Sequence, residues 1–375
     1  MNSRQSDLTR ELTVFIKYFE PYFQKYFEKK IKESLRFSPL ISRFYQDLAD
    51  FSSGGKRMRA FLVYLGYLVG ENKDTPFKET PLKGMLPICL AMEIIHSFLL
   101  IHDDIIDKSE TRHGGPTIHK RYEKLMDSPP RVDRLASRLS GRQRVEAGHY
   151  GISQAIILGD IACFEALELI NTSDFKDELK VTCERQLLSI LRETGYGEAL
   201  DVESTYRGGT LARIRQVMDL KTARYSFVGP LIIGATLGGV RERQIKGLVK
   251  FGHSCGMAFQ LRDDILGVFG DEKIIGKPLD FLEGKNTILI FKTYELAGAS
   301  EKASLRRIWG RRKANSTDLK LVQKVIKDCG ALEWCEKEQL KLARAAKNVI
   351  GDITSNKRLQ IILGQIVDFV IKREK

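Results

Sequence analysis

Two clusters of aspartate residues, 160 positions apart, are the part of this chain whose residue types and spacing most directly suggest chemistry. The first holds Asp103, Asp104 and Asp107 in His-Asp-Asp-Ile-Ile-Asp, and the second holds Asp263 and Asp264 in Gln-Leu-Arg-Asp-Asp-Ile-Leu-Gly. Each cluster ends a strongly apolar run, where carboxylates are costly unless a cation neutralises them. Two such clusters indicate a shared site for a polyvalent cation.

The spacing within the first cluster favours Mg²⁺. On a helix, Asp103 and Asp107 would lie one turn, about 5.4 Å, apart on one face, with Asp104 beside them. Hard oxygen ligands without His or Cys suit Mg²⁺, which binds through a few carboxylates, waters and substrate phosphates. A solvated acidic helix end explains one such pair equally well, but it explains two pairs poorly. The substrate should therefore carry phosphate.

A basic turn supplies the cations that a phosphate site needs. Gly54-Gly55-Lys56-Arg57-Met58-Arg59 precedes an apolar helix that we expect to begin near Ala60. Its glycines allow close backbone approach, and a helix N-terminus attracts anions. Lys56 and Arg59, three residues apart, can point the same way. Further cations lie after the acidic clusters or near them, and together they would neutralise two diphosphates: Arg112, Lys221, Lys277 and Lys285.

The elements that must position these residues are helices. Apolar residues recur at three- and four-residue intervals, which predicts an all-α protein. We expect helices over 7–33, 37–50, 57–70, 82–108, 117–126, 150–171, 174–195, 210–237, 242–270, 282–298, 316–328, 331–350 and 355–373. Several are long enough to line a deep cavity. No Ser, Gly or Pro-rich linker divides the chain, so we expect one domain, 1–375.

The one compositional break is a probable insertion at 128–148, which begins Ser-Pro-Pro and is rich in arginine. Its cations are Arg131, Arg134, Arg138, Arg142 and Arg144. Such a segment could form a short basic helix that helps to dock the protein on an anionic membrane, at on the order of 1 kcal/mol per arginine. A solvent-exposed loop without a function is an equally good interpretation.

Composition points to a soluble cytoplasmic protein. The six cysteines lie scattered among 375 residues, without the spacings of a zinc site or a disulfide framework, so we expect a reducing cytosol. The first residues lack a signal sequence, and charged residues interrupt each apolar run before it could span a bilayer.

The formal charge of +13 is uneven, because residues 301–375 hold 18 Lys and Arg against 9 Asp and Glu. These charges recur at helical spacing among apolar residues, so a solvated helix face is favoured over binding to nucleic acid.

Further motifs occur in a fixed order along the chain. After the basic turn come Glu93-Ile-Ile-His96, the first aspartate cluster, and Gly-Pro-Thr-Ile-His at 115–119; then Ala155-Ile-Ile-Leu-Gly-Asp160, Lys221-Thr222-Ala223, Gln260 through Asp264, Phe-Gly-Asp at 269–271 and Gly276-Lys277-Pro278. In these motifs the chain, from about Gly54 to Thr287, resembles the trans-isoprenyl diphosphate synthases, or polyprenyl synthetases. The resemblance implies antiparallel helices around a deep cavity, usually in a homodimer. It also implies head-to-tail condensation of isopentenyl diphosphate with an allylic diphosphate.

The resemblance also implies roles for single residues. Mg²⁺ ions, three per active site, would be held on the allylic diphosphate by Asp103, Asp104, Asp107, Asp263 and Asp264. Arg112, Lys221 and Lys277 would contact that diphosphate. Isopentenyl diphosphate would be bound by Lys56, Arg59 and His96, with His113, Lys285 and Arg373 as further substrate-binding residues. Thr222 and Gln260 would lie beside the developing allylic cation.

The chain departs from the family pattern at several positions. His113 stands where a second arginine is common, which would weaken that contact. Gly267 replaces the third aspartate of the second motif, and two residues are missing before Asp280, which puts the contribution of Asp280 in doubt. The arginine-rich insertion also has no counterpart in the pattern.

Phe98, five residues before Asp103, stands where short-chain members of the family place an aromatic ring. With Leu99 beside it, the pattern resembles archaeal geranylgeranyl diphosphate synthases, so we expect that product. Farnesyl or longer products remain alternatives. A class I terpene cyclase would need no second diphosphate site, and a regulatory subunit would show eroded aspartate motifs. Nucleic-acid binding would need basic and aromatic residues gathered on one face.

Overall fold

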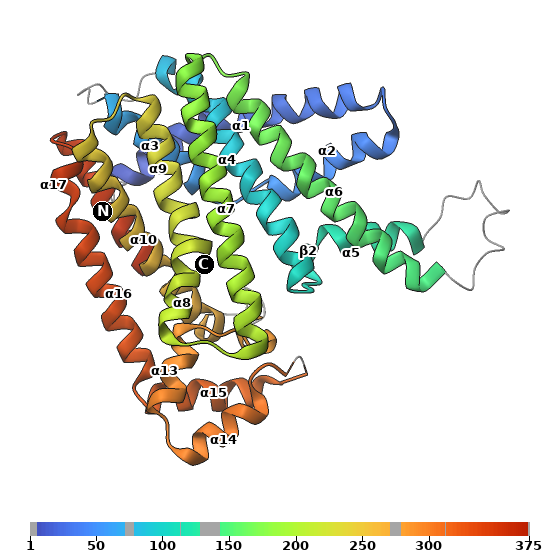
Figure 1. Ribbon diagram of the computed structural model, residues 1–375, viewed down its shortest axis with the longest axis vertical. Coiled ribbons are helices and arrows are strands. Elements are labelled where there is room, and N and C mark those ends of the chain that lie inside the picture. Colours follow the sequence, from blue (N-terminus) through green and yellow to red (C-terminus); the bar gives the residue numbers. More distant parts are fainter. Residues whose placement is uncertain are drawn as a thin grey trace, which may run out of the picture. The chain divides into compact units, whose positions relative to one another are not determined.

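The computed structural model describes residues 6–71, 79–112, 114–127, 143–270, 279–311 and 313–373 (Figure 1). Within these ranges the strands are β1 (Thr111–Arg112) and β2 (Gly115–Pro116), which pair antiparallel, and nearly all other ordered elements are helices. The all-α prediction is confirmed. Most of the expected insertion lies outside the described residues, and the described chain resumes with α6 at Gln143.

The chain groups into two compact units, and neither is one continuous segment. Unit 1 comprises Met1–Leu12, Leu62–Phe77 and Val181–Lys375, and unit 2 comprises Thr13–Phe61 and Lys78–Lys180. Three helices pass from one unit to the other: α1 (Asp7–Ser34), α3 (Met58–Glu71) and α7 (Asp177–Arg207). The single domain and its deep cavity stay predictions.

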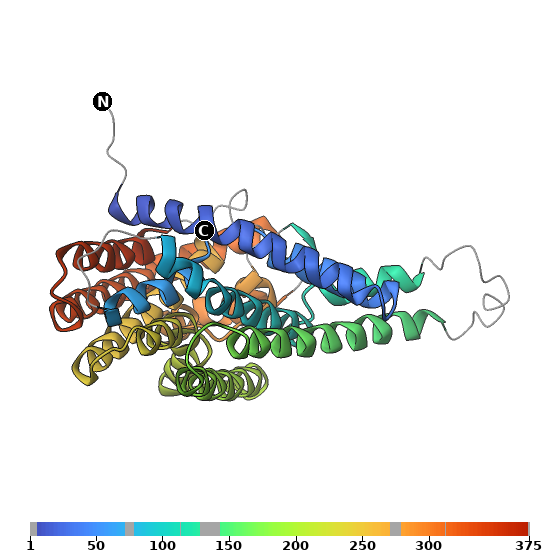
Figure 2. The same cartoon turned by 90° about the horizontal axis from the view of Figure 1, so that it is seen from above.

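Unit 2 is built around α4. Its other main helices are α2 (Pro39–Ser52), α5 (Ile118–Asp127) and α6 (Gln143–Asn171), and α4 (Glu79–Ile106) contacts all three. Figure 2 shows α1 running alongside α6, where Tyr26 and Tyr45 both donate hydrogen bonds to Glu165. Lys30 adds an ion pair to the same carboxylate at 2.6 Å. This buried polar network fixes α1 and α2 against α6.

Helix α4 corrects one expectation about the sequence. By length and composition its stretch Leu82–Ile106 could cross a membrane, although charged residues such as Glu93 lie within it. However, 67% of the relevant window is buried inside the structure. Helix α4 therefore behaves as the core helix of unit 2.

Unit 1 is built around α10 (Glu242–Phe269), and it contains most of the remaining helices. They are α8 (Leu211–Val217), η2 (Met218–Val228), α9 (Gly229–Leu237), α12 (Leu279–Glu283), α13 (Ile288–Leu296), α14 (Ala299–Ile308), α15 (Ser316–Asp328), α16 (Ala331–Asn348), α17 (Ile350–Ile353) and α18 (Lys357–Lys372). Helix α10 contacts η2, α16, α17 and α18. Helices α3 and α9 touch through their backbones, since a Cβ on Gly234 would lie 1.8 Å from the carbonyl oxygen of Val63.

Three expected helices need correction, and one helix was missed. Helix α7 continues to Arg207 rather than ending near 195, and the helix expected over 210–237 is a π-helix, η2, in its middle third. The helix expected over 282–298 is split, because Gly284 is left-handed (φ 74°) and Thr287 caps a new helix, α13. Helix α14 was not expected.

Candidate active site

The first aspartate cluster lies at the C-terminal end of α4, in unit 2. The helix ends at Ile106, and the Asp107 N–H closes the last turn by donating to the Asp103 carbonyl at 2.8 Å. Lys108 then leaves the helix in a left-handed conformation (φ 56°). A helix C-terminus carries partial negative charge, so three carboxylates gathered there require cations nearby.

Arg112 supplies one of those cations. Its Nε donates to the Oδ1 and Oδ2 atoms of Asp104 at 2.9 and 3.0 Å, and its Nη2 donates to Asp103 at 3.3 Å. The β1–β2 hairpin holds Arg112 in place, and Thr117 ties the hairpin back to the Ser109 carbonyl at 3.0 Å.

Asp104 is 1% exposed, and the environment opposes its ionisation. Burial raises the pKa of Asp104; Arg112 counteracts this rise, whereas Asp103 and Asp107 add to it. Arg112 therefore does not fully offset the combined effect of burial and of the two neighbouring carboxylates. Further positive charge would stabilise this end of α4.

The basic turn is anchored by Arg57, which was not among the expected site residues. Gly54, Gly55 and Arg57 all have left-handed backbones, with φ of 79°, 75° and 52°. The Arg57 side chain is buried and donates to the Ser52 carbonyl at 2.5 Å and to Glu20 at 2.7 Å. Lys56 is exposed and Arg59 is half-buried on either side of this anchor. Arg57 therefore shapes the turn, and substrate binding by its neighbours Lys56 and Arg59 stays a prediction.

Two contacts fix the basic turn to α4. Glu93 accepts a hydrogen bond from the Ala60 N–H at 3.1 Å, which caps the start of α3. The hydroxyls of Ser52 and Ser97 form a buried hydrogen bond of 2.6 Å. His96 lies between these attachment points, and it shares a face of α4 with Asp103, since seven residues make two turns, about 10.5 Å. Unit 2 thus combines the basic turn, His96 and the first aspartate cluster.

In unit 1 the second cluster divides into a buried and an accessible aspartate. Asp264 is 2% exposed, and its carboxylate accepts hydrogen bonds from Gln260 Nε2 at 2.9 Å and the Ile288 N–H at 3.3 Å. Gln260 in turn accepts a hydrogen bond from Thr222 at 2.7 Å. Burial, and then the nearby Asp280, raise the pKa of Asp264 well above its ordinary value. This chain of contacts supports a positioning role for Asp264, and direct metal binding by it stays a prediction.

Asp263 is more accessible and pairs with the C-terminal Arg373. The Arg373 Nη2 lies 2.7 Å from Asp263 Oδ1, and its guanidinium stacks 4.0 Å above the Phe259 ring. Arg262 holds the same residue by donating to the Arg373 carbonyl at 2.9 Å. Arg373, expected to bind isopentenyl diphosphate, therefore lies beside the second aspartate cluster.

Asp280 occupies the space that a side chain at position 267 would fill. A Cβ on Gly267 would lie 2.2 Å from the Asp280 Oδ2 atom. The carboxylate missing from position 267 is thus supplied from α12, next to the turn of α10 that carries Asp263. The two residues missing before Asp280 had put its contribution in doubt. In the structure Asp280 nevertheless lies next to Gly267.

Lys221 contacts two acids on α7 that the sequence analysis missed. Its Nζ lies 2.7 Å from Glu198 and 2.9 Å from Asp201. The two acids are three residues apart and share one face of the helix. Both acids follow Gly195 and Gly197, where the sequence resembles a helix end, so they were not expected to lie on a helix face beside Lys221.

Two glycines on neighbouring helices pack closely against the π-helix η2, which carries Lys221 and Thr222. A Cβ on Gly197 of α7 would lie 2.7 Å from the Lys221 nitrogen, and a Cβ on Gly256 of α10 would lie 2.4 Å from the Ala223 Cα. The wider π-helix, a feature frequent at functional sites, therefore fits only because both neighbours lack side chains.

Residues 39–326 match the polyprenyl synthetase family. The chain belongs to this family.

The chain is 30% identical over 341 residues to a short chain isoprenyl diphosphate synthase from Methanothermobacter thermautotrophicus, with 86% of this chain and 88% of that protein covered. It is 29% identical to a geranylgeranyl diphosphate synthase from Saccharolobus solfataricus, with 87% and 88% covered. The crystal structure of a geranylgeranyl pyrophosphate synthase from Corynebacterium glutamicum, complexed with isoprenyl diphosphate and magnesium, is similar at a TM-score of 0.84 and 27% identity, covering 96% of this chain and 98% of that chain. The resemblance drawn from the motifs is confirmed.

Because Gly256 packs directly on η2 in this polyprenyl synthetase, we expect Gly256→Ala to lower kcat about a hundredfold, the usual effect of misplacing catalytic groups by about 1 Å. Thr222 and Gln260 would move, whereas the overall helical content, measured by circular dichroism, should stay the same. Gly195→Ala on α7 is the control, since a Cβ there meets nothing within 4 Å. Parental kcat in a folded Gly256→Ala variant would show that η2 tolerates the contact.

The structure also describes Lys285, Phe98 and Leu99, which were expected to bind substrate or to limit product length. Lys285 lies 3.5 Å from Glu283, and Phe98 and Leu99 are half-buried on α4. His113 and Lys277 lie outside the described residues, so their roles stay predictions.

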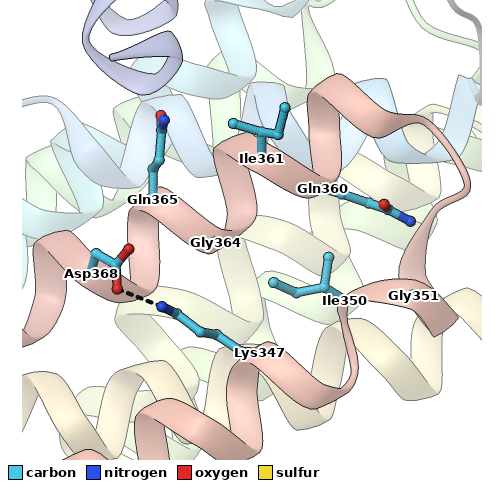
Figure 3. A pocket seen from close by; sticks show the side chains of 8 residues that line it. All are labelled: Lys347, Ile350, Gly351, Gln360, Ile361, Gly364, Gln365 and Asp368. Carbon is cyan, nitrogen blue, oxygen red and sulfur yellow. Dashed lines mark hydrogen bonds and ion pairs between the residues drawn. The ribbon is translucent and has the colours of Figure 1, made fainter.

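A shallow cavity of about 460 Å³ lies elsewhere in unit 1, between α16–α17 and α18 (Figure 3). The Lys347–Asp368 ion pair, at 2.6 Å, closes one side of it, and Ile350 and Ile361 line it. None of the residues expected to bind substrate or metal lines this cavity.

The donor set of the aspartate clusters fits Mg²⁺. The clusters offer carboxylate oxygens only, and the Asp104 carboxylate, whose pKa is raised mainly by burial, would be stabilised by added positive charge. Among the described residues, no three His, Cys, Asp or Glu side chains form a ready-made metal site.

Proposed function

We propose that this protein is a Mg²⁺-dependent prenyltransferase that condenses isopentenyl diphosphate head to tail with allylic diphosphates. Dimethylallyl, geranyl and farnesyl diphosphates are the primers, and geranylgeranyl diphosphate is the product. The observation that carries this proposal is the pairing of each aspartate cluster with an arginine, Arg112 or Arg373, together with a separate basic turn around Lys56.

The two kinds of site divide the substrates between them. The aspartate clusters, through three Mg²⁺ ions, suit the allylic diphosphate, whose bond to carbon must break. Bound Mg²⁺ would stabilise the charge on the departing diphosphate. The basic turn contains no acidic residue and suits a diphosphate that is bound without metal and does not leave. Lys56, Arg59 and His96 would hold isopentenyl diphosphate there.

The chain's own residues would orient and stabilise the reacting groups. Thr222 and Gln260, linked at 2.7 Å, would direct oxygen atoms toward the allylic cation. Lys221 would exchange its contacts with Glu198 and Asp201 for the allylic diphosphate. Arg112 would stay on Asp104 and contact the same diphosphate from the hairpin.

The test is to incubate the purified protein with Mg²⁺, isopentenyl diphosphate and each of the three primers, and then to size the products. We expect a C20 diphosphate from every primer. Consumption of an allylic diphosphate without isopentenyl diphosphate would instead support a terpene cyclase. No turnover with any primer would leave a regulatory subunit as the better interpretation.

A homodimer is the second part of this proposal. Helix α6 exposes Ile152, Ile156, Ile157 and Phe164, the last at 65%. An apolar stripe of this kind on one helix suits burial against a second copy of the chain.

We expect Phe164→Asp to convert the dimer into a monomer, because a carboxylate would be buried without a partner. Light scattering after size-exclusion chromatography measures the change. Leu340→Asp on α16, where the leucine is 46% exposed, is the matched control and should stay dimeric. A monomeric parent protein, or an unchanged mass for Phe164→Asp, would exclude this interface.

A further inference from the structure

The excess positive charge near the C-terminus is concentrated in one short stretch. Residues 302–327 hold nine Lys and Arg against a single acid, Asp318, a net charge of +8. Residues 328–375 hold nine Lys and Arg against seven acids, so they are nearly balanced. Most of the chain's formal charge of +13 therefore comes from 26 residues.

The described residues of this stretch belong to α14, α15 and the turn between them, which lie together at one end of unit 1 (Figure 1). Seven of the cations are exposed, and together they are called the cationic face: Arg306, Arg307, Arg311, Lys313, Lys320, Lys324 and Lys327. In the described ranges, no ion pair joins any of them to an acid. The Asp318 carboxylate is used locally, because it accepts the Asn315 N–H at 3.0 Å and caps α15.

The neighbouring helix α16 shows that this charge is unusual. Its Lys337 lies 2.8 Å from Glu333, and its Lys341 lies 3.6 Å from Glu338, so acids accompany its cations. On α15, Lys320, Lys324 and Lys327 are spaced i, i+4, i+7 along one face, and no acid lies between them. The charge of the cationic face is thus left available to an anionic partner.

The lysines of the cationic face on α15 stand on a helix that packs into the core. Val322, Val325 and Ile326 bury the opposite side of α15 in unit 1. An anionic partner would therefore meet these lysines on a preformed helix. Leu321, 42% exposed between the lysines, adds one apolar contact.

We propose that the cationic face docks the protein on an anionic lipid bilayer. Lysines and arginines held near such a surface are attracted to its headgroup phosphates, and the attraction accumulates over several charges. The choice of partner rests on the proposed function, because a C20 diphosphate has an anionic head and a long apolar tail that partitions into membrane. Nucleic acid fits less well, because the one aromatic residue of the stretch, Trp309, packs against Phe281 at 5.8 Å and is not free to stack on bases.

The test is flotation of the full-length protein with vesicles of phosphatidylcholine, with and without 30% phosphatidylglycerol, at about 50 mM and 500 mM salt. We expect binding only to the anionic vesicles and only at low salt. The triple variant K320Q/K324Q/K327Q should bind about a hundredfold more weakly, from the loss of three charges near the surface. K337Q/K341Q/R344Q removes the same charge with the same spacing from α16 and should bind like the parent.

Equal loss in both triple variants would show a general charge effect and overturn the proposal, as would parental binding by K320Q/K324Q/K327Q. Tighter binding to duplex DNA than to anionic vesicles, lost in the same variant, would assign the face to nucleic acid instead. Turnover of dimethylallyl and isopentenyl diphosphates in solution should be the same in all three proteins. A parent without turnover refutes the proposed function, whereas failure of vesicle binding alone refutes only the docking surface.

Discussion

Asp103→Ala and Asp263→Ala should each lower kcat by about a thousandfold or more, because each removes a carboxylate that would hold the ions stabilising the leaving diphosphate. The several kcal/mol expected from such metal ions correspond to about 10³ to 10⁴ in rate. Steady-state kinetics with isopentenyl and geranyl diphosphates at saturating Mg²⁺ measure the loss.

Folding should survive both substitutions. Each substitution removes a partly exposed ion pair, Asp103 with Arg112 or Asp263 with Arg373. It also relieves repulsion, because Asp103 and Asp263 add to the pKa rise that burial causes at Asp104 and Asp264. A partly exposed ion pair contributes about 0–1 kcal/mol, so we expect Tm to stay within a few degrees of the parent. Asp177→Ala, at a side chain that is 93% exposed, is the control for loss of an acid and should keep full activity.

Chelation provides an independent check on the same prediction. Excess EDTA should abolish turnover, and added Mg²⁺ should restore it, without a large change in Tm. Turnover that persists in the chelator, or an Asp103→Ala variant with parental kcat, would remove the metal from the mechanism.

Helical periodicity alone predicted most of the fold, because the spacing of apolar residues in a long amphipathic segment indicates a helix. It failed where tertiary contacts override local signals. The Thr194–Gly197 segment resembles a helix end, yet α7 continues through it because Gly197 is needed for close contact with η2. The π-helix has no distinct sequence pattern, and only the packing of Gly256 on Ala223 reveals why it forms.

The candidate site shows the same limit. Asp103, Arg112, Thr222 and Gln260 could be named because they lie in motifs with chemical meaning. The structure adds that Arg112 donates to Asp103 and Thr222 donates to Gln260, and their roles in binding and catalysis stay predictions. Asp280 could not be placed, because its approach to Gly267 depends on how α12 packs on α10. The partners of Lys221 on α7 were missed for the same reason: they are 20 or more residues away in the chain.

Phe98 on α4 is expected to limit product length, and the structure gives a reason why its ring should be immobile. The Phe98 ring packs edge-on against His102 at 4.9 Å. His102 lies against α6, where a Cβ on Gly159 would be 2.4 Å from its Nε2, and that nitrogen lies 3.2 Å from the Ile156 carbonyl oxygen. These contacts should hold the Phe98 ring in one position.

Phe98→Ala should therefore yield products longer than the C20 diphosphate proposed for the parent, because loss of the ring opens a cavity that can accept further isoprene units. The ring lies about 7.5 Å along α4 from Asp103, upstream of the end where the allylic diphosphate would bind. Product sizing by reversed-phase chromatography measures the change, and Phe98→Tyr, which keeps the ring, should leave the length unchanged. Because Phe98 is only half-buried, its loss should cost less stability than the 3–5 kcal/mol of a fully buried phenylalanine, and the variant should stay folded. If the folded and active Phe98→Ala variant still stops at C20, another residue ends the chain, and the assignment of product length from position 98 is wrong.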